Sequence, residues 1–378
     1  MAQGKRPLSE NAMSRPAAGA GLVQGVPPSE SAPRAVADLY HAYFTGLILT
    51  LVSRRGSTDA ARWMHAVFRH QHHEKFLSSF EKLGLAGMPH AVACAAYHYL
   101  SNSIGGVGVE FMRESDRKAW VRFVPPRWIY MGAAICGVPS DVSRGFLTGW
   151  YAQNGVSLKN PRLGFVCTAQ TVDGQHGLAG YFMEYDHDLA PDERLVFRPG
   201  EMPPPFDPDA APRLPAGDWS PERLARAYRN YAMEYVRSGL PRLMELFGET
   251  EGAHLGHLTG RMIGAQFYKE IAGAAGIVST DAEALARLLA WIAEGEGDSA
   301  TVGRDGDSVL LSRTGWRLMR GIANPSPGVM DAWNGLIEGL AMVHNRFLTI
   351  ELVERVDHGA PQTVWRIRER APGAIVIA

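Results

Sequence analysis

The stretch "HAVFRHQHHEKF", residues 65–76, contains four histidines, an arginine and a glutamate. Imidazole is the side chain that exchanges protons near neutral pH, and a guanidinium can bind a carboxylate through two parallel hydrogen bonds. The stretch could therefore form a solvated helix face, a metal site or the wall of a pocket.

A helix over residues 57–84 would place positions 65, 69, 72 or 73, 76, 80 and 83 on one face. The apolar end of this face, from residue 76 onward, should point to the core, so His65, Arg69 and either His72 or His73 should also point inward. Buried polar groups need partners, which favours a ligand. We predict the three histidines as acid–base groups and Arg69 as the residue that binds the ligand. A surface role, with the arginine stem lying over apolar neighbours, is the alternative.

The same face occurs twice in the chain. Setting His257 against His65, an offset of 192 residues (257 − 65), also places Arg261 on Arg69 and several glycines on glycines. Shared element order over such a span predicts a tandem duplication. In the second copy, small residues at 264 and 265 could open space that Tyr268, His254 and His257 would line. His257, Arg261 and Tyr268 are the candidate substrate-binding residues of this copy.

Proline-rich and glycine-rich stretches divide the chain into four parts. Residues 1–34 resemble a disordered tail, and 197–219 resemble a stiff linker or a surface-hugging arm. Between and after them lie the two copies, 35–196 and 220–372. Each copy is expected to be α+β, with helices over a small antiparallel sheet.

Two further residues could take part in a site. Cys136 precedes a helix start, where a thiol can have a lowered pKa and act as a catalytic nucleophile, although a buried structural cysteine is the more frequent case. Trp150 lies near the end of a long helix. It could line an aromatic pocket and bind substrate there, with core packing as the alternative.

The stretch "ICGVPSDVSRGFLTGWYAQNG", followed by "FVCTAQTVDGQHGLAGYFMEYD", resembles the end of the 4-vinyl reductase domain, which is related to TRAPP vesicle-tethering subunits. It is also similar in layout to bacterial proteins grouped as aminothiazoline carboxylic acid hydrolases. The resemblance implies a pocket between helices and sheet for a small organic or aromatic ligand. Members of these families are enzymes or sensors.

The phenol-sensing relatives bind zinc through a cysteine at a helix start and a Glu-x-x-Cys…Gly-x-x-x-Cys hairpin. In this chain Cys136 matches the first position, but Cys167, Gln170 and Leu178 stand at the other three. Zinc requires four N, S or O ligands. We therefore expect no metal and no cofactor.

The composition limits the classes of partner. The chain has 378 residues, and 38 basic residues against 39 acidic ones give a formal charge of −1, so we expect no nucleic acid. We also expect no membrane span, no secretory signal and a cytoplasmic location, because no apolar run is long enough and the cysteines show no paired spacing. The predicted function is a hydrolase or lyase acting on a small carboxylated or aromatic compound. A non-catalytic ligand-binding or sensory module is the alternative, and a homodimer stays open.

Overall fold

The computed structural model describes residues 31–370, and the expected tail lies outside them except for its last four positions. The first copy contains α1 (Ser31–Arg55), α2 (Ser57–Phe80), α3 (His90–Ile104), β1 (Val109–Ser115), β2 (Lys118–Phe123), α4 (Ser140–Gly149), α5 (Asn154–Ser157), β3 (Leu163–Ala169), β4 (Leu178–Glu184) and β5 (Leu195–Phe197). Short 3₁₀ turns lie between these elements: η1 (Trp128–Tyr130), η2 (Gly132–Gly137), η3 (Tyr151–Gln153) and η4 (Thr171–Asp173).

The second copy repeats this order. It contains α6 (Pro221–Phe247), α7 (Glu249–Ala274), α8 (Ala282–Glu296), β6 (Ser299–Asp305), β7 (Ser308–Thr314), α9 (Pro327–His344), β8 (Leu348–Glu354) and β9 (Thr363–Glu369), with turns η5 (Arg317–Met319) and η6 (Val356–His358). The strand orders agree, β1-β2-β4-β3 followed by β5 in one sheet and β6-β7-β9-β8 in the other. The predicted α+β fold with two tandem copies is confirmed.

Glycines mark the same junctions in both copies. Gly56, before α2, has φ 90° and ψ 169°, and Gly248, before α7, has φ 82° and ψ 160°. A residue with a side chain rarely adopts such a positive φ, so glycine is favoured at both sharp turns. Later in each copy, a Cβ on Gly149 would lie 2.6 Å from His65 O, and one on Gly335 would lie 2.3 Å from His257 O. The second copy therefore aligns with the first as the sequence predicts.

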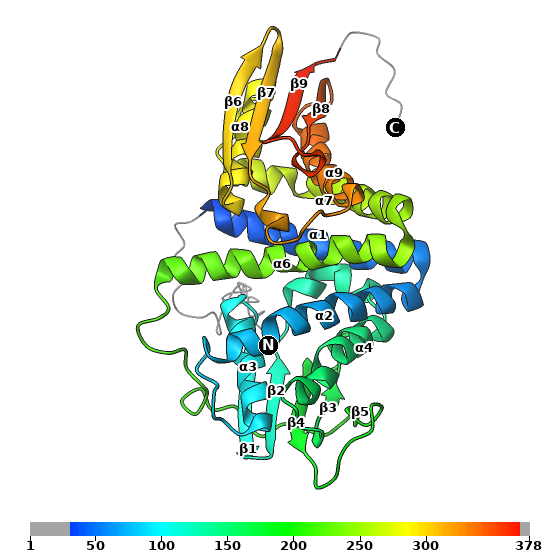
Figure 1. The fold of residues 1–378 in the computed structure, drawn as a ribbon, viewed down its shortest axis with the longest axis vertical. Coiled ribbons are helices and arrows are strands. Elements are labelled where there is room, and N and C mark those ends of the chain that lie inside the picture. The colour runs from blue at the N-terminus through cyan, green and yellow to red at the C-terminus, as the bar shows by residue number, and fades with distance from the viewer. Residues whose placement is uncertain (1–30, 371–378) are drawn as a thin grey trace, which may run out of the picture.

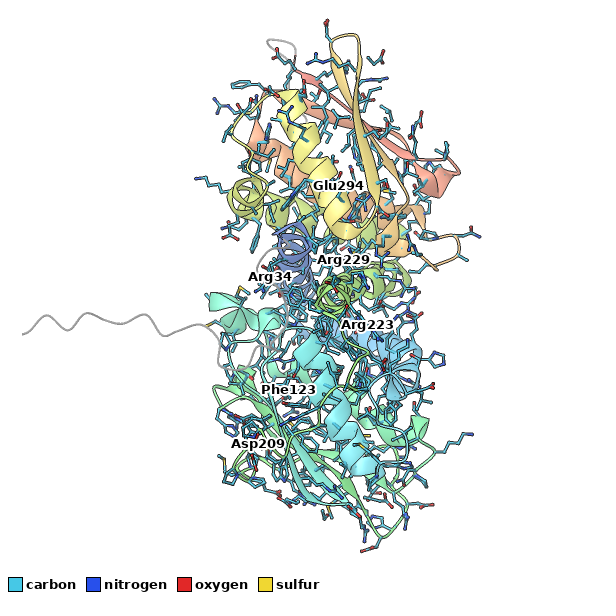
Figure 2. All side chains as sticks on the ribbon, turned by 90° about the vertical axis from the view of Figure 1, so that its left-hand side faces the viewer. Arg34, Phe123, Asp209, Arg223, Arg229 and Glu294 are labelled. Carbon is cyan, nitrogen blue, oxygen red and sulfur yellow. The ribbon has the colours of Figure 1, made fainter. Side chains whose placement is uncertain are left out.

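The first helices of the two copies lie together across the middle of the molecule, with one lobe on each side (Figure 1). We call residues 57–197 the first lobe and 249–370 the second lobe. Helix α1 packs on α7 and α8 of the second lobe, while α6 packs on α2 and α3 of the first. Arg229 of α6 lies between the lobes (Figure 2), and its Nη1 donates a hydrogen bond to Gly295 O at 3.4 Å. Each lobe is therefore completed by the first helix of the other copy.

Helix α1 is long and apolar enough to cross a membrane by length and composition, which corrects the expectation that no apolar run reaches that length. It is the one helix among residues 31–370 that meets this test, and 67% of its most apolar window is buried inside the fold. Its apolar character is explained by its place between the lobes.

The structure selects one of two alternatives for the first connecting segment and corrects the expectation for a second. Residues 198–219 contain no helix or strand, and Phe206 packs on a small cluster that includes Trp120 and Tyr181 of the first sheet. This segment is thus an arm on the sheet rather than a free linker. The long helix that was expected to end near Trp150 is broken, because α4 ends at Gly149 and η3 and α5 follow it.

Candidate functional site

A cavity of about 380 Å³ lies in the first lobe, between α2, α3, α6 and η1. This volume falls within the range of cavities that hold small organic ligands. Aromatic side chains make up much of its wall: Phe68, Tyr97, Trp128, Phe146, Trp150, Tyr151, Trp219, Tyr231 and Tyr235. The wall thus combines helices from both copies, because α6 belongs to the second.

A buried arginine forms part of this wall. Arg127 is only 8% exposed, and its guanidinium lies 4.4 Å from the ring centroid of Phe123. Burial raises the pKa of the Tyr151 hydroxyl, and the positive charge of Arg127 opposes that rise. Sequence reasoning missed Arg127, because it follows two prolines and belongs to no periodic stripe.

Trp150 and Tyr151 supply buried polar atoms to the same wall. Trp150 was predicted as a pocket residue, and it lines the cavity. Its Nε1 and the Tyr151 hydroxyl are buried and have no hydrogen-bond partner among residues 31–370. A buried donor without a partner costs about 1–3 kcal/mol, so both atoms suit a ligand that offers an acceptor.

Further polar groups of the wall are bound to one another. The Tyr235 hydroxyl donates to the Tyr231 hydroxyl at 2.9 Å, and Tyr231 donates to Asn102 Oδ1 at 2.8 Å. At the more exposed side of the cavity, Lys75 Nζ lies 3.4 Å from the Glu234 carboxylate. These contacts hold α2, α3 and α6 together around the cavity.

His72 and His98 are linked through an asparagine beside the cavity. His72 Nε2 lies 3.1 Å from Asn154 Oδ1, and Asn154 Nδ2 lies 3.4 Å from His98 Nε2. Arg69 Nη1 lies 3.4 Å from His72 Nδ1. His98 is in the cavity wall, stacked on Tyr151 with ring centroids 4.1 Å apart.

Burial keeps both histidine rings neutral, and the hydrogen bonds determine which ring nitrogen carries the proton. Burial and then the charge of Arg69 lower the pKa of His72 to about 4, and burial holds the pKa of His98 well below its usual range. Both rings are therefore neutral near pH 7. His72 accepts from Arg69 at Nδ1 and donates from Nε2, while His98 accepts at Nε2, so its proton resides on Nδ1.

The predicted inward face is wrong for His65, which is exposed. Of the adjacent pair, only His72 is buried, as the helical spacing predicts, and His73 is exposed. His65 Nδ1 lies 3.1 Å from Thr148 Oγ1 on α4. Helix α2 buries a neighbouring stripe that includes Phe68, His72 and Phe76, so the line through residues 65, 69 and 73 lies to the side of the core. Arg69 is half-buried beside His72 and does not belong to the cavity wall.

Cys136, the predicted nucleophile, is exposed on η2 and lies outside the cavity wall. All three cysteines of the chain, Cys94, Cys136 and Cys167, are free. The 3₁₀ turn places Cys136 before α4 begins at Ser140, so its thiol is not at the helix start.

The predicted binding residues of the second copy lie on the outer side of α7. His257 Nε2 is 3.1 Å from the Glu338 carboxylate, and Arg261 Nε is 3.9 Å from it, in an open groove. The Tyr268 hydroxyl lies 2.9 Å from His344 Nδ1, in neither this groove nor the cavity. Gly264 opens no space, since a Cβ there would lie 2.3 Å from Leu336 O. Ala265, however, lines the open groove together with His254 and His257, so the expected second-copy space forms at residue 265 and not at residue 264.

Within residues 31–370, no three histidine, cysteine, aspartate or glutamate side chains gather closely enough to hold a metal ion. The alternative of a metal site built on His65, His72 and His73 has no support, because His72 is buried whereas His65 and His73 are exposed. Comparisons with protein-family models, curated proteins and solved structures give no match to this chain.

Proposed function

We propose that the protein binds a small, largely apolar organic molecule in the first-lobe cavity and acts as a ligand-binding or sensory module. The carrying observation is the pair of unpartnered buried donors, Trp150 Nε1 and the Tyr151 hydroxyl, set in an aromatic wall. Such a wall gains free energy from ring burial, while the donors fix the orientation of the ligand. The resemblance to 4-vinyl reductase-type domains points to the same kind of pocket.

A hydrolase or lyase is the second candidate, and one observation favours it. His98 presents a neutral imidazole in the cavity wall, with its tautomer set by Asn154. Burial holds the pKa of His98 far below neutrality, which makes it a weak general base. Ligand binding therefore has the stronger support. The free cysteines agree with a reducing compartment such as the cytoplasm.

Two serines on α3 offer a matched test of the cavity. Ser101 lines the cavity, whereas Ser103 is half-buried on the same helix and does not. Ser101→Leu should fill part of the space and weaken binding of a neutral aromatic probe, 2-naphthamide, by about tenfold or more, since overpacking excludes the ring. Ser103→Leu should leave the affinity within about twofold of the native value. Isothermal titration calorimetry on the full chain measures both.

Two outcomes would contradict the proposal. One is no binding of 2-naphthamide, or of its acid, at concentrations of about 1 mM, which is the weak limit of specific recognition. The other is an equal loss for both leucine variants, which would mean that binding takes place away from the cavity. Pre-steady-state turnover of a bound ester would instead support the enzyme.

A further inference from the structure

Four polar side chains in the inner part of the cavity wall are neutral near pH 7. Gln71 of α2 and His98 of α3 are each 3% exposed, and they line the cavity together with Trp150 and Tyr151. Burial holds the pKa of His98 well below its usual range and raises the pKa of the Tyr151 hydroxyl. These four residues therefore bind a ligand through hydrogen bonds between uncharged groups.

The charged groups of the wall already have contacts or lie at its exposed side. Lys75 Nζ is 3.4 Å from the Glu234 carboxylate, which also binds Arg237 Nη1 at 3.0 Å. The guanidinium of Arg127 is engaged within the fold, and Lys82 is exposed. Among the described residues, an ionised ligand in the inner part of the wall would thus lose water without gaining a free counter-ion, which is costly.

Gln71 offers an acceptor to the ligand. Its Nε2 donates to the backbone carbonyl of Glu234 at 3.2 Å. A carbonyl oxygen can only accept, so this contact fixes the orientation of the side-chain amide. Its Oε1 then has no hydrogen bond among residues 31–370 and can accept one from a ligand N–H.

The neighbouring side chains offer donors. Asn154 Nδ2 donates to His98 Nε2, so the proton of His98 resides on Nδ1. Trp150 Nε1 and the Tyr151 hydroxyl have no hydrogen-bond partner in the part of the chain that the structure describes. An indole N–H can only donate, whereas a hydroxyl can donate or accept. A ligand that satisfies the whole inner wall therefore supplies both an acceptor and a donor.

We propose that the ligand is an uncharged aromatic amide, whose N–H donates to Gln71 Oε1 and whose carbonyl accepts from Trp150 Nε1. An amide group is planar and neutral, and it carries a donor and an acceptor on adjacent atoms. The aromatic body then packs on the rings of Phe68 and Tyr235. This inference rests on the proposed function, and it assigns recognition of the ligand to Gln71 in place of Arg69.

Three probes of nearly the same shape separate donor, acceptor and charge. 2-Naphthamide and 2-acetonaphthone share a carbonyl, but only the amide has N–H groups. In calorimetry on the full chain at pH 7.5, the amide should bind about threefold to tenfold tighter, because it gains the hydrogen bond to Gln71. 2-Naphthoate, the charged isostere, should bind about tenfold weaker than the amide or worse. Trp150→Phe should weaken the amide and the ketone by similar factors, since both present a carbonyl.

Gln71→Met should abolish the preference for the amide over the ketone and leave the ketone affinity within about twofold of the native value. Gln153→Met is the matched control, because Gln153 Nε2 also donates to a backbone carbonyl, Thr148 O at 3.2 Å, and Gln153 lies outside the cavity wall. It should leave the preference unchanged. Should Gln71→Met not fold, the order of the three probes on the native chain still decides.

Failure of the amide assignment differs from failure of the proposed function. Ketone or naphthoate binding as tight as the amide or tighter, still blocked by Ser101→Leu, would overturn the amide assignment and leave the cavity as a ligand site. An equal loss of preference in both glutamine variants would do the same. Absence of binding by all three probes would overturn the ligand site as well.

Discussion

In the first lobe, Trp150, which follows α4 directly, borders an open cavity, whereas the matching Leu336 of α9 is buried against α7. The same contrast holds one helix away. His72 of α2 is buried beside Asn154 of α5. The matching residue of α7 is Gly264, which lets the backbone of α9 approach α7 directly. Both lobes bring two helix backbones together, at Gly149 in the first and at Gly335 in the second. Only the second lobe continues this contact at Gly264, whereas the first lobe has a buried histidine there and a cavity bordered by Trp150.

The central helices show the same difference. Tyr43 of α1 and Tyr235 of α6 occupy matching positions. The single hydroxyl hydrogen of Tyr43 is shared between two backbone carbonyls of the second lobe, with Gly256 O at 2.9 Å and Ala332 O at 2.7 Å from the hydroxyl oxygen. Tyr235 instead lies in the cavity wall and donates to Tyr231. The two halves of the duplicated fold therefore differ, because one surrounds a cavity and the other uses the matching tyrosine to join packed helices.

The second lobe also holds a buried ion cluster where the first lobe is apolar. Arg313 occupies the sheet position of Phe123 and binds Glu296 and Asp298, with Nε 3.1 Å from Asp298. All three side chains are nearly or fully buried. Removing one partner of such a cluster leaves an uncompensated charge in the interior.

The largest expected effect follows from that cluster. Arg313→Met should lower the free energy of unfolding by about 3–5 kcal/mol, because Glu296 and Asp298 would remain buried without their counter-ion. The triple variant with Glu296→Gln and Asp298→Asn should recover a large part of the loss. Urea unfolding followed by circular dichroism measures both. A loss below about 1 kcal/mol for the single variant would show that the stability of the second lobe does not depend on this buried ion cluster.

Acid should weaken the first lobe through His72. Its folded pKa of about 4 lies below the usual value of about 6.5, so its contribution to stability is complete above pH 6.5 and is lost as the pH falls toward 4. Between pH 7 and pH 5 the loss should be about 2 kcal/mol. His72→Gln should remove that part of the pH dependence, as measured by urea unfolding at both pH values. If the free energy of unfolding of His72→Gln changed between pH 7 and pH 5 as much as that of the native chain, His72 would not be held neutral by burial.

The contact between helix backbones gives a test of the second lobe's packing. Gly264→Ala should lower stability by about 1–3 kcal/mol, because the added methyl meets Leu336 O at 2.3 Å. Gly273→Ala, on the same helix with nothing within 4 Å, should be neutral or stabilise by up to about 1 kcal/mol. Thermal unfolding compares the two variants. Equal effects would indicate that α7 and α9 can move apart without cost.

The sequence was sufficient for the fold class and the duplication, because glycines with positive φ recur at matching junctions. Gly56 and Gly248 turn the chain between the first two helices of each copy, and no other residue type adopts that backbone easily. Element order follows from such local signals. For Trp150 the sequence left a pocket and core packing as alternatives, and the side chain both belongs to the core cluster and borders the cavity.

The rest of the site depends on contacts that are distant in sequence. Tyr231 and Tyr235 reach the cavity only because α6 crosses to the other copy's lobe, which no local pattern indicates. Arg127 follows a proline pair and has no periodicity to reveal its burial. On α2, apolar and polar residues alternate so closely that the sequence placed His65 and Arg69 on the inward face. The face that is buried is the neighbouring one, with Phe68 and His72. Gly145 and Gly149 of α4 let that helix lie against α2, and this contact determines which face of α2 is buried.

The smallest expected effects concern the exposed histidines of α2. Adjacent helix positions are turned by about 100°, so His72 faces the interior and His73 faces solvent. His65→Ala and His73→Ala should each change the free energy of unfolding by no more than about 0.5 kcal/mol and leave ligand affinity unchanged. His72→Ala should cost more, because it removes a stacked ring and leaves Asn154 Oδ1 without its donor. Urea unfolding and calorimetry on the three variants measure this order. A large loss of binding for His65→Ala or His73→Ala would return the site to the outer face of α2, and the contrast between the two lobes would then need another explanation.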